Sequence, residues 1–255
     1  KRAIALTRAK GNLVYLCTGR SKAEIYDFIL ECGIDGVIGA GGGYIEIGNQ
    51  MLYHKKVTNK AVNHMVDYFD TNNFDYYVES NGGLFASKNL VKRLERIIYG
   101  DYENDPQAKA RYEKKDSHFI NALIEGQEMR RDDINKACFL ENPNIPFNNI
   151  IKEFDREFNV IHCTVPAFGD NSGELSVPNI HKANAIETLI NYLGIERKNT
   201  YAFGDGMNDK EMLEYVNIGI AVGNAKEGLK AVADEITDNI DNNGIYNSMK
   251  KHNLI

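Results

Sequence analysis

The sequence is poor in the features that mark secreted and membrane proteins. Its 255 residues include only four cysteines, which are scattered and form no Cys-x-x-Cys pair. This usage fits a reducing compartment better than a disulfide scaffold, and we expect all four to be small core residues. No apolar run approaches the roughly 20 residues that span a bilayer, and none resembles the apolar region of a signal peptide. We therefore expect a cytoplasmic protein without a membrane partner.

The sequence also lacks an excess of positive charge. Thirty lysines and arginines face 36 aspartates and glutamates, so the formal net charge is −6. Such a chain has no global field that attracts nucleic acid or an anionic membrane. An anionic substrate would have to be held by a few local positive groups. Internal repeats and low-complexity tracts are absent as well.

Two stretches of alternating strands and helices flank a stretch of different character. Apolar runs such as Leu13–Cys17 and Thr200–Phe203 are typical of parallel strands buried on both faces. Between them, hairpin signals and polar turns indicate α+β structure. We predict an α/β protein in which residues 1–56 and 175–255 form a doubly wound, Rossmann-like parallel sheet. Residues 57–174 are predicted to form an inserted α+β domain.

Two local patterns follow the first apolar run. Ser21 and Glu24 match a capping box, which predicts a helix with Phe28 on its inner face and an end at Gly33. The run Gly39–Gly43 is too rich in glycine for regular structure and predicts a loop.

The segment Tyr201–Lys210 predicts a strand, a turn and the start of a helix. Asp205 and Asp209 would then lie at the carboxyl end of a strand, where open α/β sheets bind ligands. Two such carboxylates can converge on one cation, and oxygen ligands favour Mg²⁺ over zinc. The alternative is an ordinary turn with Asp209 as the helix N-cap. A dinucleotide fingerprint is less consistent, because Asp209 replaces its third glycine and would repel a pyrophosphate.

Thr18 ends a predicted strand and begins a turn toward a helix. Its hydroxyl and the amides that follow could therefore form an anion site in the same crevice as Asp205. The simpler alternative is that Thr18 merely terminates the strand.

Lys182 falls in the first turn of a predicted helix, where a cation opposes the helix dipole. This placement suggests that it balances an anion, which could be a bound phosphate or the acid pair itself. A solvated surface lysine is the alternative. The neighbouring His181 could act as a general acid, although a plain loop residue is the favoured interpretation.

A hydroxyl, a lysine and two carboxylates at strand ends and helix starts match the needs of phosphoryl transfer. The sequence offers no nucleophile to go with them. No Asp-x-Asp follows an apolar strand near its beginning, and no serine or cysteine lies on a nucleophile elbow.

The chain resembles the haloacid dehalogenase superfamily, specifically the Cof-type phosphatases of subfamily IIB, which have a large α/β cap. The resemblance lies in a short set of motifs in the right order on both flanks: Cys17–Arg20, Lys182, Gly204–Asp209 and the tail from Ala221–Ala225 to Asn243 and Gly244. It implies a Mg²⁺-dependent phosphomonoesterase that works through an aspartyl-phosphate on a sugar phosphate or similar small phosphorylated metabolite. The cap, here the insert, would close over the leaving group and set specificity.

The resemblance also implies roles for individual residues. Thr18 and Gly19 would hold the phosphate, Lys182 would bridge phosphate and nucleophile, Asp205 would bind Mg²⁺ directly, Asp209 would support the metal shell, and Asn208 would contact substrate or phosphate.

Two departures from the family pattern stand out. The family's first motif, Asp-x-Asp-Gly-Thr on the central strand, should precede Lys1, and we expect the natural protein to begin earlier. The run Gly39–Gly43 stands where the family has an asparagine before a glycine.

Two other functions compete with the phosphatase. A catalytically silent relative would bind phosphate esters without turnover. A receiver-type signalling domain also uses acids, a threonine and a lysine, but the long insert between Thr18 and Lys182 argues against it.

Overall fold

The computed structural model describes all residues from Lys1 to Ile255, which form two compact units. The core unit comprises Lys1–Arg20, Ile25–His54 and Ile180–Ile255, and the insert unit comprises Ser21–Glu24 and Lys55–Asn179. The main segment of the insert thus begins two residues earlier and ends five residues later than the predicted 57–174. Parallel strands flanked by helices confirm the predicted α/β class.

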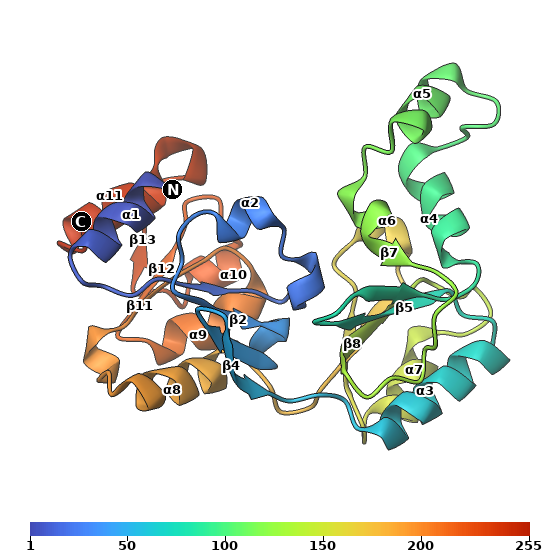
Figure 1. Ribbon diagram of the computed structural model, residues 1–255, viewed down its shortest axis with the longest axis horizontal. Helices are drawn as coiled ribbons and strands as arrows, with labels where there is room; N and C mark the ends of the chain where they lie inside the picture. The colour runs from blue at the N-terminus through green and yellow to red at the C-terminus, as the bar shows by residue number, and fades with distance from the viewer. The chain divides into compact units, whose positions relative to one another are not determined.

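The core unit contains two sheets (Figure 1). The first runs in the order β1 (Tyr15–Cys17), β2 (Gly36–Gly39), β3 (Tyr44–Ile47) and β4 (Gln50–His54). The second is parallel and runs in the order β11 (Tyr201–Gly204), β12 (Ile218–Ala221) and β13 (Glu235–Ile236). β1 is parallel to β2, and β1 and β11 each pair on one side only. The doubly wound sheet that we predicted is therefore divided between β1 and β11.

One hydrophobic core joins these two sheets. Ile38 and Ile45 from the first sheet and Ala202 from the second belong to a single buried cluster, together with Leu189 and Leu213 from the helices α8 and α9. The helices of the core unit are α1 (Arg2–Ala9), α2 (Asp27–Leu30), α8 (Lys182–Leu193), α9 (Lys210–Tyr215), α10 (Glu227–Lys230) and α11 (Gly244–Lys251). The shared core holds the carboxyl ends of β1 and β11 in one unit.

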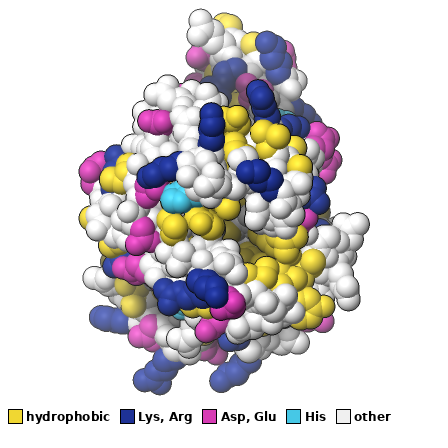
Figure 2. Space-filling model, turned by 90° about the vertical axis from the view of Figure 1, so that its left-hand side faces the viewer, with side chains coloured by type: hydrophobic (Ala, Val, Ile, Leu, Met, Phe, Trp, Pro, Cys, Tyr) yellow, Lys and Arg dark blue, Asp and Glu magenta, His cyan; other side chains and the backbone are white.

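The apolar strands next to the division are incompletely covered. All three residues of β1 are only half-buried, whereas all four of β2 are buried. In β11, Tyr201 and Phe203 are half-buried as well. On the side of the molecule seen in Figure 2, apolar patches lie among the charged side chains.

The insert unit is built on a six-stranded sheet with helices on both faces. In spatial order its strands are β7 (Leu123–Ile124), β6 (Leu84–Ala86), β5 (Tyr76–Ser80), β8 (Ile134–Phe139), β10 (Gly173–Ser176) and β9 (Asn159–His162). Its helices are α3 (Asn59–Thr71), α4 (Leu90–Tyr99), α5 (Pro106–Lys114), α6 (His118–Ala122) and α7 (Phe147–Phe154).

Aromatic side chains attach α3 and α7 to one face of this sheet. The ring of Phe69 lies 5.0 Å from that of Tyr76, 5.3 Å from that of Phe139 and 5.7 Å from that of Phe154. On the opposite face, Leu94 of α4 and Ile120 of α6 cluster with other buried residues of the sheet. Alternation along the strands thus gives each face its own apolar layer.

The capping box predicted at Ser21 does not form. Residues 22–24 make a single 3₁₀ turn, and α2 begins only at Asp27. The hydroxyl of Ser21 instead accepts a hydrogen bond from Asn135 Nδ2 at 3.0 Å within the insert unit. Phe28, predicted to face inward, is 60% exposed.

None of the helices combines the length and the apolar character needed to cross a membrane.

His64 joins α3 to α7, and its contacts with two glutamates predict a pH effect on stability. Its Nδ1 lies 2.5 Å from Glu157 Oε2 and its Nε2 lies 2.8 Å from Glu153 Oε1. The hydrogen bond with Glu157 raises the pKa of His64 above its ordinary value, despite partial burial. A raised folded-state pKa gives stability that is fully present below the unfolded pKa of about 6.5 and is lost as pH rises through the folded value.

We therefore expect thermal stability to fall as pH rises above about 6.5, and to fall less steeply in His64→Gln. The measurement is the melting temperature of both proteins from pH 5.5 to 8.5, compared as a difference so that other titrating groups cancel. Parallel curves for the two proteins would rule out this role of His64.

Candidate functional site

The turn after β11 gives its two carboxylates different surroundings. Asp209 Oδ2 accepts hydrogen bonds from the backbone N–H groups of Asp205 at 3.0 Å and Gly206 at 3.2 Å. Asp209 is buried, whereas the side chain of Asp205 is exposed and has no hydrogen bond or ion pair within the chain. The carboxylate of Asp209 makes no capping bond to α9, so the alternative of a simple N-cap does not describe it.

Gly204 allows this turn to close. A Cβ atom at this position would lie 2.7 Å from Asp209 Cβ, closer than carbon atoms approach each other in proteins. The glycine at the end of β11 is therefore a packing requirement of Asp209, which its place in the motif did not reveal.

Lys182 forms a buried ion pair with Asp209. Its Nζ lies 2.5 Å from Asp209 Oδ1, and the two residues are only 5% and 4% exposed. The alternative of a solvated surface lysine is thereby excluded, and the lysine contacts Asp209, one member of the acid pair. An ammonium group has three N–H donors, so two remain for other acceptors.

His181 has a structural place beside this pair. It is the N-cap of α8, and its Nδ1 accepts a hydrogen bond from the Asn184 N–H at 3.4 Å. This fits the favoured interpretation of His181 as a loop residue that starts the helix.

Thr18 and Gly19 lie in the same unit, next to Asn208. A Cβ atom on Gly19 would lie 4.0 Å from Asn208 Nδ2, which places the loop after β1 beside the turn after β11. The N–H of Thr18 continues the pairing with β2 by donating to Ile38 O at 2.8 Å. Thr18 Oγ1 accepts from the Arg20 N–H at 3.2 Å, and its own hydrogen stays available for a ligand.

Cys17, the last residue of β1, also lies near the ion pair. Burial raises the pKa of its thiol to about 12, against the positive charge of Lys182, which lowers it, and together with the negative charge of Asp209, which raises it. A thiol with this pKa stays protonated at neutral pH, so Cys17 is no nucleophile here.

The glycine-rich loop ties these pieces together. The Gly41 N–H donates to Thr18 O at 3.0 Å, and the Ala40 N–H donates to Arg20 O at 2.8 Å. Gly42 has a φ of +108°, and a Cβ atom there would lie 2.6 Å from His181 O, at the start of α8. The run Gly39–Gly43, which departs from the family pattern, thus allows close contact between the Thr18–Arg20 loop and the helix that carries Lys182.

Gly42→Ala is therefore expected to lower both stability and turnover. The added methyl group meets a backbone oxygen, and the alanine that carries it must adopt a left-handed backbone conformation. Together these cost about 1–3 kcal/mol. Gly41→Ala is the matched control, since Gly41 also has positive φ but has nothing within 4 Å of its would-be Cβ. Urea unfolding and ester hydrolysis measure both effects. Equal losses in the two variants would contradict the contact argument.

The loop after β12, for which we predicted no role, also supports Asp205. The Lys226 N–H donates to Asp205 O at 3.0 Å, and the Val222 N–H donates to Gly204 O at 3.0 Å. These bonds hold the backbone on which the exposed carboxylate is carried.

The carboxylates of Asp205 and Asp209 fit the ligand preferences of Mg²⁺. Asp205 offers an exposed carboxylate, and Mg²⁺ commonly uses only one or two protein carboxylates, with water and substrate oxygens as its other ligands. Both oxygens of Asp209 already have hydrogen-bond partners, so its fit is to the outer part of such a site.

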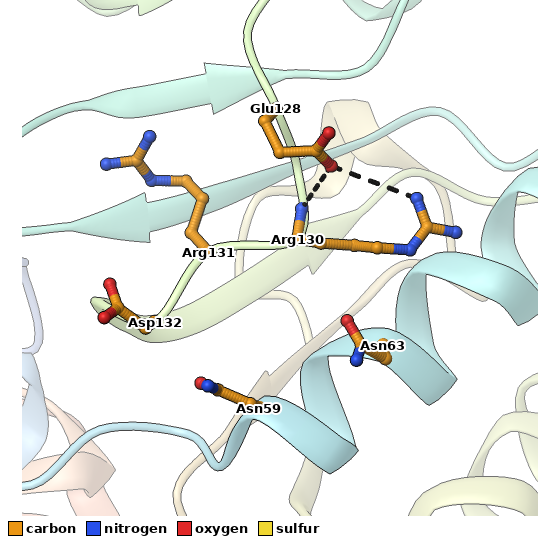
Figure 3. A pocket seen from close by; sticks show the side chains of 6 residues that line it. All are labelled: Asn59, Asn63, Glu128, Arg130, Arg131 and Asp132. Carbon is orange, nitrogen blue, oxygen red and sulfur yellow. Dashed lines mark hydrogen bonds and ion pairs between the residues drawn. The ribbon is translucent and has the colours of Figure 1, made fainter.

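A pocket of about 440 Å³ lies elsewhere, in the insert unit (Figure 3). It is lined by polar and charged side chains: Asn59, Asn63, Glu128, Arg130, Arg131 and Asp132. Its two guanidinium groups are already paired, Arg130 with Asp67 at 2.6 Å and Arg131 with Asp133 at 2.8 Å. None of the predicted site residues lines this pocket.

An α/β core, an inserted domain, and a lysine–carboxylate pair at the carboxyl ends of the core strands define a class of hydrolase. The chain belongs to the haloacid dehalogenase-like hydrolase family, whose model matches residues 1–249.

Individual relatives agree with this assignment. YwpJ of Bacillus subtilis (strain 168), named as a phosphatase, is 27% identical over 97% of this chain and 90% of its own length. A solved structure from Geobacillus kaustophilus HTA426 is 25% identical, with a TM-score of 0.80 over 100% of this chain and 90% of the other. The structure of the subclass IIB sugar phosphatase BT4131 is 22% identical, with a TM-score of 0.71 over 100% and 90% of the two chains, and shows the shared fold.

Proposed function

We propose that this hydrolase is a Mg²⁺-dependent phosphatase of small phosphomonoesters, sugar phosphates or similar cytoplasmic metabolites. The observation that carries the proposal is the buried Lys182–Asp209 pair beside the exposed carboxylate of Asp205. The names of YwpJ and of the BT4131 sugar phosphatase support the reaction and the substrate class.

Each residue of the site has a role in this proposal. The hydroxyl of Thr18 and the amide of Gly19 hold the phosphate, and Asn208 contacts it from the neighbouring turn. Lys182 donates its remaining N–H groups to phosphoryl oxygens while Asp209 fixes its position. Asp205 would hold Mg²⁺ directly and Asp209 would support the metal shell. When bound, the ion neutralises charge on the phosphoryl oxygens.

The nucleophile in this proposal is an aspartate of an Asp-x-Asp motif, on a strand that pairs between β1 and β11. Both strands have a free edge, and their apolar side chains are half-buried. A parallel strand placed there would satisfy both edges and make the sheet continuous. Its aspartate would attack the phosphorus atom, the ester P–O bond would break with release of the alcohol, and water would then hydrolyse the phosphoaspartate to phosphate.

The test begins with the intact mass and N-terminal sequence of the protein purified from its complete reading frame. Phosphate release from a panel of esters is then measured with Mg²⁺ and with excess chelator. We expect an Asp-x-Asp motif, release with Mg²⁺ and loss of release with chelator. Tight binding of phosphate esters with no release would instead favour the catalytically silent binding module.

A further inference from the structure

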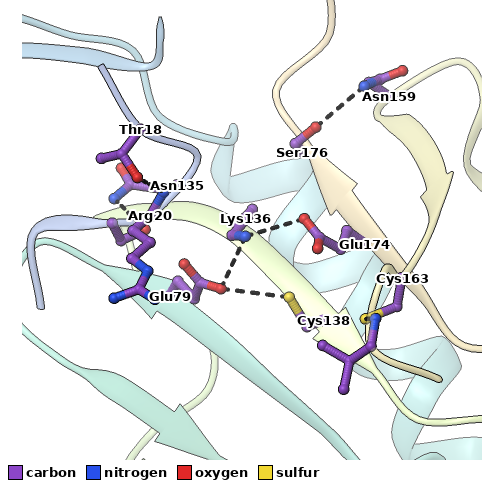
Figure 4. Close-up of polar contacts among 12 residues, drawn as sticks. Thr18, Arg20, Glu79, Asn135, Lys136, Cys138, Asn159, Cys163, Glu174 and Ser176 are labelled. Atoms are coloured by element: carbon purple, nitrogen blue, oxygen red, sulfur yellow. Dashed lines mark hydrogen bonds and ion pairs between the residues drawn. The ribbon is translucent and has the colours of Figure 1, made fainter. Parts of the chain in front are cut away.

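One edge of the six-stranded sheet in the insert unit is open. β9 is the last strand in the order β8-β10-β9 and pairs only with β10, antiparallel and with Ile161 opposite Glu174. Figure 4 shows β9, between Asn159 and Cys163, on the side of β10 that faces away from Lys136. The other edge strand of this sheet, β7, has only two residues. β9 therefore offers the longer free edge.

The bonds between β9 and β10 leave two residues of β9 with backbone groups that face outward. The Cys163 N–H donates to Ser172 O at 3.1 Å, just beyond the paired strands. Because successive residues of a strand bond in opposite directions, Ile161 also bonds to β10. The N–H and C=O groups of Val160 and His162 consequently face the free edge. These two residues flank Ile161, so the outward groups are arranged symmetrically about it.

The sequence around this edge lacks the charges that usually prevent pairing with another strand. Natural proteins protect exposed edges with charged side chains, prolines or bulges. Residues 158–165 include no charged residue and no proline, and the pairing of β9 with β10 has no bulge. The run without Lys, Arg, Asp or Glu extends as far as Gly169. Charged residues make up 26% of the chain, so a run of this length that is mostly exposed is unusual.

The apolar side chains along this edge are exposed as well. Ile161 is 44% exposed, and Val165, three residues beyond the end of β9, is 42% exposed. On the opposite face, the ring of His162 stacks on Phe147 of α7 with the ring centres 3.6 Å apart. Neighbours within the unit thus hold His162, whereas Ile161 is the apolar side chain of the strand that is most open to a partner.

We propose that β9 pairs with β9 of a second copy of this chain, so that two insert units share one continuous sheet. The pairing is antiparallel about a twofold axis at Ile161, which is the arrangement that two identical strands adopt in a closed dimer. Val160 of each copy then lies opposite His162 of the other, and each such pair exchanges both of its N–H···O=C bonds. The two Ile161 side chains meet at the axis, where the strands are closest.

Symmetry and charge favour a second copy as the partner. The outward backbone groups and the exposed Ile161 are centred on the same point, as an isologous contact requires. A strand without charges brings no like charges together when it meets its own copy, whereas like charges directly opposite each other would destabilise the pair. The contact involves no residue of the candidate site, so it is independent of the proposed phosphatase function.

The test is the mass of the complete protein in solution, measured by sedimentation equilibrium from about 10 µM to about 1 mM. We expect a monomer–dimer equilibrium in which the mass approaches twice that of one chain. Ile161→Lys should raise the dissociation constant at least about tenfold, because two ammonium groups would meet at the axis. The mass of one chain at all concentrations, or growth beyond the dimer into open-ended aggregates, would overturn the proposal.

Two further variants separate pairing from folding. Ile124→Lys changes a residue that is 38% exposed on the opposite edge strand, β7, and should leave the dissociation constant unchanged. Val160→Pro removes an outward N–H without removing a bond to β10, a position at which edge strands tolerate proline, and should weaken the dimer about tenfold. A dimer of wild-type strength in folded Ile161→Lys and Val160→Pro would contradict the assignment of β9.

Hydrogen exchange of the wild type gives a readout that needs no variant. Pairing of β9 protects the amides of Val160 and His162 only in the dimer, so their exchange should slow as the protein concentration rises. Exchange at these two amides that does not depend on concentration would also overturn the proposal.

Discussion

Lys182→Met should reduce phosphate release by about 10²- to 10³-fold and also destabilise the protein. The first effect follows because the ammonium group is lost from the place where charge develops on the phosphoryl oxygens. The second follows because Asp209, which is 4% exposed, keeps its charge in a buried place without a cation. Removal of one partner of a buried pair costs about 3–5 kcal/mol. Initial rates and urea unfolding measure the two effects.

A double variant separates the loss of activity from the loss of stability. Lys182→Met combined with Asp209→Asn has no buried lone charge, and the asparagine oxygen can still accept from the Asp205 and Gly206 amides. We expect most of the lost stability to return and activity to stay low. Lys210→Met is the matched control, because Lys210 follows Asp209 directly and has only a surface partner, Glu214. Near-normal turnover in folded Lys182→Met would remove this lysine from the proposed mechanism.

Asp205→Asn should abolish Mg²⁺-dependent turnover, by at least about a hundredfold, without loss of stability. The substitution keeps the shape of an exposed side chain that has no partner in the chain, so the free energy of unfolding should change by less than about 0.5 kcal/mol. An amide in place of the carboxylate removes the charge that would hold the cation.

The readout besides activity is thermal stabilisation by Mg²⁺. The wild type should melt at a higher temperature with Mg²⁺ than with chelator, and Asp205→Asn should lose that increase. Asp241→Asn, a charge-matched change at an exposed residue of the same unit, should keep it. The assignment of Asp205 as the metal ligand fails if both variants respond to Mg²⁺ like the wild type.

Short-range patterns were sufficient to predict the corner that carries Asp205 and Asp209. Three consecutive apolar residues, two glycines and the spacing of the acids specify a strand, a turn and a helix start with little help from the rest of the chain. The predicted strand Thr200–Phe203 accordingly corresponds to β11 at Tyr201–Gly204. The family could be predicted for the same reason, because its motifs on both flanks are short-range patterns as well, and the family model confirmed it.

Long-range contacts could not be predicted in this way. Lys182 and Asp209 are 27 residues apart, and the sequence offered a phosphate and the acid pair as equal partners for the lysine. Ser21 shows the opposite failure. Its capping-box pattern with Glu24 is correct locally, but a hydrogen bond from Asn135, 114 residues away, prevails over it.

The roles of the glycines were hidden for a related reason. A sequence shows where a side chain is missing, but it does not show what would collide with one. Only the structure places His181 O against Gly42 and Asp209 against Gly204.

The four residues Ser21–Glu24 limit how this protein can be rebuilt by recombination. They follow Arg20 directly, yet Ser21 is bonded to Asn135 and the Lys22 N–H donates to Asn81 Oδ1 at 3.4 Å. A chimaera that exchanges only residues 55–179 for the corresponding domain of a relative would leave this segment facing a foreign surface. Exchange of the insert between such hydrolases therefore requires two cassettes, the long domain and the short segment that follows the Thr18–Arg20 loop.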